Sequence, residues 1–150
     1  MNPSHLQRGI DLFNLEDFYA CHDLIEEIWL EESSDRQPFL QGMIQSAVAF
    51  HHYQQGKRGA ARTMLGLAIG KLQGYPSPHL GIDLEKFLRQ LRRWKRALDE
   101  AVSRGGPVQP PLAYPRIERP AVRKAVSATD GRRQEMIRVV KESIYRGPRR

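Results

Sequence analysis

Three residues whose side chains can do chemistry lie along one line in the segment Cys21–Trp29. His22, Glu26 and Trp29 are separated by four and then three residues, which places them on the same side of an α-helix. Helical bundles build metal sites from such His and Glu side chains, and general acid–base catalysis by the same pair would use the same geometry. The spacing therefore indicates a metal or small-molecule site, but it does not name a reaction or any catalytic residue.

A second stretch, nearly free of charge, supplies the facing side of this polar centre. Phe39–His52 reads FLQGMIQSAVAFHH, and we expect one histidine of its final pair to be packed and the other to be exposed at the helix end. The predicted ligand-binding set is His22, Glu26, Gln41, Gln45, His51 and His52. The alternative interpretation is a buried hydrogen-bonded network of His22, Glu26 and Gln45 that only fixes helix packing.

Established catalytic and metal-binding motifs do not decide between these interpretations. The His-Glu-x-x-His pattern and cysteine pairs of zinc proteins are absent, and so are phosphate-binding glycine loops and dinucleotide fingerprints. Glutamine is a poor ligand for transition metals. Cys21 and His22 are adjacent on a helix and point about 100° apart, so Cys21 is expected to be a buried structural residue. The metal ligands and any cofactor stay open.

Five helices are needed to position these residues. Apolar residues recur every three to four positions over most of the first hundred residues, and no segment alternates for long enough to be a strand. Asn14 is the expected N-cap of the second helix, whose inner face includes Cys21 and His22 and whose outer face includes Asp23. The expected helices cover about 3–13, 15–30, 36–55, 57–73 and 83–102.

Small residues line one side of the fourth expected helix. Gly59, Thr63, Gly66 and Gly70 lie beside its apolar face. Because glycine inside a helix costs roughly 1 kcal/mol relative to alanine, this stripe predicts the close approach of another backbone or of a ligand. Close helix packing within the chain is one explanation, and self-association through this face is another.

The distribution of charge predicts two parts, a helical bundle of residues 1–103 and a basic tail of residues 104–150. The first part carries 12 lysines and arginines against 13 acidic residues, whereas the second carries 12 against 4, so the tail's +8 accounts for the net charge of +7. Gly105–Pro120 contains five prolines and is expected to be an extended linker. A short last helix is expected at 130–145.

The basic tail suggests partners of its own. It could contact nucleic acid, a membrane surface or a partner protein, although Tyr114 and Tyr145 are its only aromatic residues and stacking platforms for bases need more. Otherwise it is a solvated extension that docks on the acidic segment Asp11–Asp35 or on a neighbouring subunit. No run is apolar enough for a membrane span, no secretion signal is evident, and a single cysteine excludes an internal disulfide. The expected location is the cytoplasm.

Two motifs resemble those of a known family. His22–Trp29 (HDLIEEIW) looks like the His-Glu-x-x-Glu-x-x-Trp signature of the domain of unknown function 309, and Phe39–Gln45 (FLQGMIQ) looks like its Leu-Gln-Gly-Leu-Ile-Gln signature. The resemblance covers roughly Met1–Val102 and implies a compact helical bundle, but no activity. Asp23 departs from the usual glutamate, and the turn at Gly56-Lys57 lacks the usual asparagine.

These observations together predict an all-α protein, a bundle of about five helices with a basic, proline-rich extension. The function they favour is a small binding domain with its polar centre between the second and third helices. The alternatives are an interaction module that acts on protein or nucleic acid through the tail, and a metal-dependent hydrolase-like enzyme. The expected partner is a small molecule or protein of unknown identity, with a second copy of the chain as a further option.

Overall fold

The computed structural model describes residues 2–32 and 34–121, and within them the fold is all-α, as the sequence predicts. The helices run in the order α1 (Pro3–Asn14), α2 (Phe18–Glu31), α3 (Arg36–Gln54), α4 (Arg58–Leu72) and α5 (Leu84–Arg104). The only β pairing in the described ranges is an isolated bridge between His79 and Ile82. The expected last helix at 130–145 lies outside the described residues.

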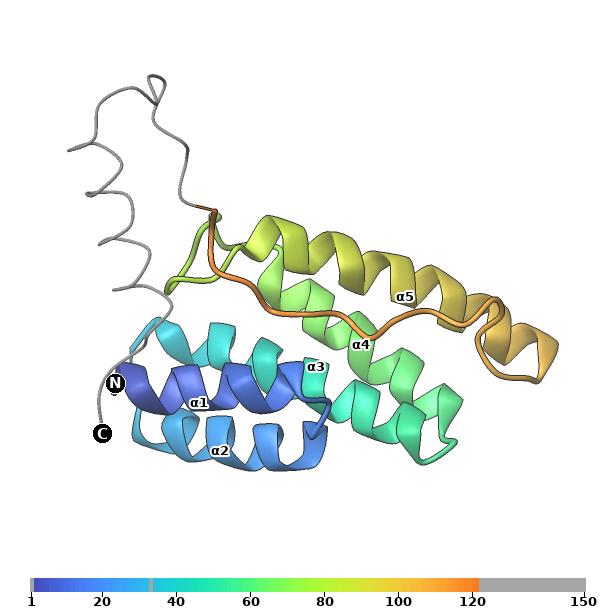
Figure 1. Cartoon of the computed structure of the whole chain (residues 1–150), viewed down its shortest axis with the longest axis horizontal. Coiled ribbons are helices and arrows are strands. Elements are labelled where there is room, and N and C mark those ends of the chain that lie inside the picture. Colours follow the sequence, from blue (N-terminus) through green and yellow to red (C-terminus); the bar gives the residue numbers. More distant parts are fainter. Residues whose placement is uncertain (1, 33, 122–150) are drawn as a thin grey trace, which may run out of the picture.

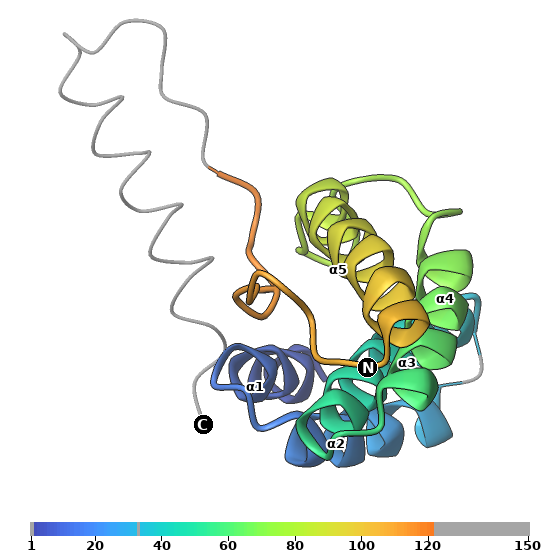
Figure 2. The same cartoon turned by 90° about the vertical axis from the view of Figure 1, so that its right-hand side faces the viewer.

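Successive helices pack against one another, and α3 lies in the middle of the bundle. α1 contacts α2, α2 contacts α3, α3 contacts α4, and α4 contacts α5. The view along the bundle in Figure 2 shows α3 between α2 and α4. The buried rings of Phe13, Phe18, Phe50 and Phe87 meet at the centre, mostly edge to face. This aromatic centre explains why the nearly charge-free α3 is buried along so much of its length.

Some helix ends follow the local capping signals, and one predicted cap is wrong. Asp83 caps α5 through its side chain, and Gly56 takes the left-handed conformation after α3, with φ of 78°. The prediction that Asn14 caps α2 is wrong, because Asp17 accepts the hydrogen bond from Ala20 N instead. Asn14 is the last residue of α1, and its amide is used elsewhere in the fold.

The glycine stripe on α4 does not mark a close approach of two backbones. A methyl group added at Gly59 or Gly70 would meet nothing within 4 Å, and at Gly66 it would only touch the end of the Lys95 side chain at 3.4 Å. Close packing against another helix is therefore the wrong explanation for this stripe within the described part of the chain, and the approach of a ligand or of a second copy stays a prediction. A tight position on a neighbouring helix is Gly42 of α3, where a methyl group would come within 2.8 Å of Leu72.

Residues 107–119, which we call the strap, run back from the end of α5 along the outside of the bundle. Figure 1 shows this extended segment passing alongside α5 toward the end of the bundle where α1 begins. Val108, Pro115 and Ile117 are buried. The strap is extended, as the prolines predict, but it is also packed against the core. The division between a bundle at 1–103 and a tail at 104–150 stays a prediction.

Hydrogen bonds from the bundle to main-chain atoms hold the strap. The Asn14 amide pairs with both the N–H and the carbonyl of Ile117, and the Gln90 amide pairs in the same way with Arg116. The indole of Trp94 donates to the carbonyl of Ala113 at 2.8 Å. An extended segment leaves its backbone groups unpaired, so these side chains supply the partners that a strand would otherwise provide.

No helix in the described ranges is both long and apolar enough to cross a lipid bilayer.

Candidate functional site

Three potential metal-ligating side chains gather on α2. His22, Asp23 and Glu26 each offer one ligand atom, and these atoms all lie within 4.8 Å of one another. Asp23 and Glu26 are exposed, while His22 is half-buried. The Nε2 atom of His22 lies 3.7 Å from a carboxylate oxygen of Asp23. The described residues therefore present an imidazole and two carboxylates at one place on the surface.

A backbone hydrogen bond fixes the orientation of the His22 ring. Its Nδ1 atom lies 2.8 Å from the carbonyl oxygen of Tyr19. A carbonyl only accepts hydrogen bonds, so Nδ1 must carry the proton in this contact. In the neutral ring, Nε2 then keeps its lone pair and faces the carboxylate. Metal-binding histidines are commonly oriented by such a bond from the other ring nitrogen.

The apolar face of α2 decides which polar side chains of this helix lie at the protein surface beside His22. Phe18, Cys21, Ile25 and Ile28 are buried, and their spacing turns one side of the helix toward the core. His22 lies next to this buried face, and Glu26 follows one turn later on the solvent side. The predicted alignment of His22 with Glu26 is therefore realised at the protein surface.

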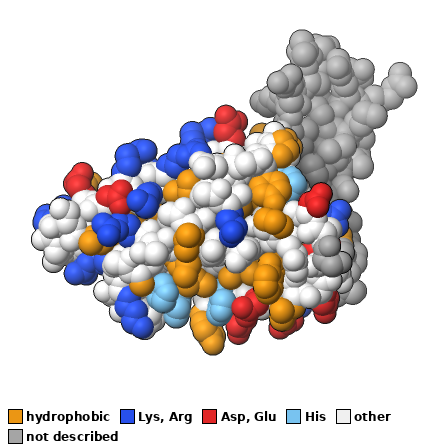
Figure 3. All heavy atoms as spheres, turned by 180° about the vertical axis from the view of Figure 1, so that it is seen from behind, with side chains coloured by type: hydrophobic (Ala, Val, Ile, Leu, Met, Phe, Trp, Pro, Cys, Tyr) orange, Lys and Arg blue, Asp and Glu red, His pale blue; other side chains and the backbone are white. Residues whose placement is uncertain are grey.

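One α3 residue of the predicted set, His51, is connected to the cluster on α2 through an aromatic contact. The Tyr19 ring lies 5.1 Å from the ring of His22 and 5.3 Å from that of His51, measured between ring centroids. Figure 3 shows the face on which histidine side chains lie among hydrophobic ones, with acidic side chains close by. Tyr19 thus links the two helices at the predicted polar centre.

The two histidines at the end of α3 do not divide into one packed and one exposed residue, because both are half-buried. That prediction is wrong, since the end of the helix is only partly covered by its neighbours. Burial lowers the pKa of His52 from its ordinary value, and the nearby charges of Lys57 and His51 act in the same direction. His52 is thus disposed to stay neutral.

Gln41 and Gln45 are half-buried on α3. The Gln45 Oε1 atom is buried and accepts no hydrogen bond. Among the described residues, no hydrogen bond joins His22, Glu26 and Gln45, because Glu26 extends to solvent. The structure thus groups His22 with Glu26 and connects His51 to them through Tyr19. His52 reaches this group only through the neighbouring ring of His51, with centroids 6.4 Å apart, and the described residues show no such connection for Gln41 or Gln45.

Sequence reasoning missed two participants, Asp23 and Tyr19. Asp23 was expected on the outer face of the helix, where it indeed lies exposed, but its carboxylate still comes near the imidazole of the preceding residue. An acid directly after a histidine and four residues after an aromatic residue is a weak signal. Neither position belongs to a pattern that distinguishes a site from an ordinary solvated helix face.

Cys21 is structural, as expected. It is buried and free, and burial raises the pKa of its thiol to about 12, with the negative charge of Asp17 adding to the effect and a backbone hydrogen bond at Phe13 opposing it. A thiol that stays protonated is a poor nucleophile. The side chain therefore contributes packing and takes no part in the neighbouring polar cluster.

Comparison with known proteins agrees with this fold and adds no activity. An uncharacterized protein of Aquifex aeolicus (strain VF5) is 27% identical over 73 residues, which make up 48% of this chain but 22% of that protein. The crystal structure of a conserved hypothetical protein from Thermus thermophilus is similar with a TM-score of 0.56 and 29% identity, over 65% of this chain and all of the other.

The family profile covers the part of the chain that contains both motifs. The matching residues, 6–64, extend from α1 into α4 and include the whole of the His22, Asp23 and Glu26 cluster. The resemblance seen in the two sequence motifs is thereby confirmed, since residues 6–64 of this helical protein match the family model of the domain of unknown function DUF309.

Proposed function

We propose that the chain is a small binding domain that holds a divalent transition-metal ion through His22, Asp23 and Glu26. The observation that carries this proposal is the convergence of three ligand atoms within 4.8 Å of one another. Imidazole and carboxylate together suit ions such as Zn²⁺. The bond from Nδ1 of His22 to the Tyr19 carbonyl supports the same function, because it leaves Nε2 as the ligand.

Because the cluster is exposed, the metal site that it would form is open to solvent. Three protein ligands on one helix occupy one side of an ion and leave the remaining positions to water or to an oxygen of a bound molecule. Such an open site resembles a catalytic or exchangeable metal site more than a closed structural one. The proposal therefore makes the ion a binding partner of the folded protein. It also predicts that the protein folds without the ion, since the aromatic core does not depend on the cluster.

The test is isothermal titration of the full-length protein with Zn²⁺. We expect one ion per chain, and we expect His22→Ala and Glu26→Ala to weaken binding at least tenfold while the helical circular dichroism is retained. His52→Ala and Glu27→Ala are matched controls, because they remove an imidazole and a carboxylate that lie outside the cluster. Equal loss in the controls, or binding that survives His22→Ala, would show that the ion binds elsewhere.

We place the protein in the cytoplasm, which the single, buried cysteine supports. A fluorescent fusion imaged in cells tests this location.

A further inference from the structure

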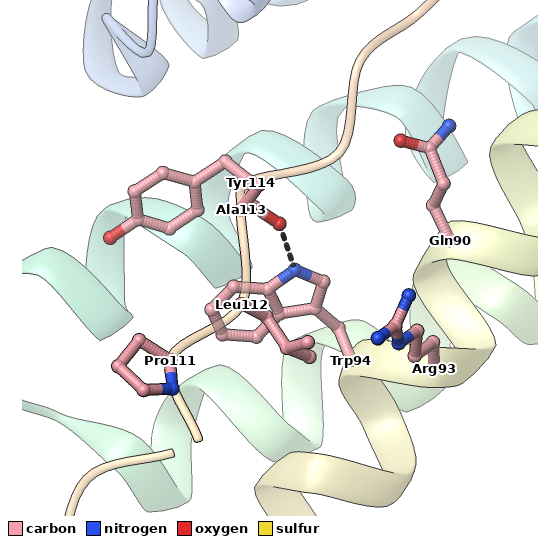
Figure 4. Close-up of a pocket in the computed structure, with 7 residues that line it drawn as sticks. All are labelled: Gln90, Arg93, Trp94, Pro111, Leu112, Ala113 and Tyr114. Atoms are coloured by element: carbon pink, nitrogen blue, oxygen red, sulfur yellow. Dashed lines mark hydrogen bonds between the residues drawn. The ribbon is translucent and has the colours of Figure 1, made fainter. Parts of the chain in front are cut away.

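A cavity separate from the cluster on α2 lies between α5 and the strap. Its volume is about 340 Å³, and it is lined by Gln90, Arg93 and Trp94 of α5 and by residues 111–114 of the strap. Figure 4 shows Trp94 reaching from α5 to the carbonyl of Ala113 on the strap, with Gln90 and Arg93 on the side of the helix. The volume is at the small end of the range for small-molecule sites, roughly 300–1,000 Å³, which suits a ligand built around a single ring.

The apolar lining of this cavity is rigid. The Trp94 indole stacks on the Tyr114 ring with centroids 5.4 Å apart and planes 4° from parallel. The indole N–H donates to the Ala113 carbonyl at 2.8 Å, so the ring cannot rotate freely. Pro111 and Leu112 add apolar surface from the strap. A flat apolar group can therefore enter without reordering the walls.

The polar side chains of the lining are already bonded, with one exception. The Gln90 amide is occupied by the N–H and carbonyl of Arg116 and by the Lys86 carbonyl, and the Trp94 N–H is occupied by Ala113. Arg93 has no carboxylate partner in the part of the chain that is described. Four other cations of α5 each pair with an acid: Lys86, Arg89, Lys95 and Arg104.

We infer that this cavity binds a small aromatic carboxylate. The carboxylate pairs with the Arg93 guanidinium, which presents a fork of donors that matches two oxygens. The ring lies against Pro111 and Leu112, over the small part of Trp94 that stays exposed. A sugar or polyol fits poorly, because the lining offers one unpaired charged group and few free hydrogen-bonding atoms for several hydroxyls.

Ligand binding in this cavity is coupled to the docking of the strap on the bundle. Residues 111–114 form one wall of the cavity, and they contact α5 through the single hydrogen bond from Trp94 and the ring stack. A ligand that touches both walls binds only while the strap is docked. It therefore slows exchange of the strap amides, by the general rule that a ligand stabilises the state that binds it.

The test is a titration of the ¹⁵N-labelled full-length protein with 3-phenylpropionate, followed by NMR. We expect saturable shifts at the Trp94 indole and the Ala113 amide. The uncharged analogue 3-phenylpropionamide is expected to bind at least tenfold more weakly. Arg93→Gln should reduce the affinity for the acid at least tenfold, which is the loss expected for a charge-assisted pair.

Arg96→Gln is the matched control, since Arg96 is an exposed arginine of the same helix outside the cavity. It should bind the acid as the wild type does. Failure of the acid to shift Trp94 at millimolar concentration would overturn the proposal. So would equal binding of acid and amide, or equal losses in Arg93→Gln and Arg96→Gln. Because Zn²⁺ is absent from this titration, its result is independent of the site on α2.

Discussion

Removing the amide of Asn14 should loosen the strap from the bundle. The amide donates to the Ile117 carbonyl at 2.9 Å and accepts from the Ile117 N–H at 2.8 Å, and Ile117 is 2% exposed. Each hydrogen bond contributes roughly 0.5–1.5 kcal/mol net, and losing the partner also leaves the Ile117 groups unpaired. We therefore expect Asn14→Ala to lower the free energy of unfolding by about 1–3 kcal/mol.

Equilibrium unfolding in urea measures this loss, and hydrogen exchange at the Ile117 amide locates it. The midpoint should fall while the m-value stays the same, because the surface exposed on unfolding is nearly unchanged. Arg8→Ala is the control, since Arg8 is an exposed residue of the same helix that does not line the cavity beside Ile117, and it should change stability by less than about 0.5 kcal/mol. An Asn14→Ala protein as stable as this control, with Ile117 still protected, would refute the assigned role of the amide.

Two further predictions concern the core. Gly42→Ala should lower the free energy of unfolding by about 1–3 kcal/mol, because the new methyl group would lie 2.8 Å from Leu72. Gly70→Ala, which meets nothing within 4 Å, should instead raise it by roughly 0.5–1 kcal/mol, and urea unfolding of both variants checks the contrast. The second prediction is that stability falls with rising pH between 9.0 and about 12, the ordinary and the folded pKa of Cys21. In that interval the folded state binds more protons than the unfolded state, so the free energy of unfolding declines by about 1.4 kcal/mol per pH unit. Subtracting the pH dependence of Cys21→Ala isolates this effect, and identical curves for the two proteins would contradict it.

The sequence by itself determined the helices and the residues that they bury. α5 is the clearest case, because Asp83 supplies a cap and Leu84, Leu91 and Leu98 recur at heptad spacing, with all three buried. The alignment of His22 with Glu26 was likewise a consequence of helix geometry alone. These features depend on residues within a few positions of one another, and such local relations can be read directly from the order of side chains.

Only the tertiary structure decided where the polar groups of different segments meet. Asn14 looked like a helix cap, but its amide binds Ile117, which is 103 residues away in the chain. The strap was expected to be a linker, yet the amides of Asn14 and Gln90 and the indole of Trp94 satisfy its backbone. The partners of an extended segment come from other elements, and no periodicity within it reveals them. The cavity beside Arg93 exists for the same reason, since one of its walls is that segment.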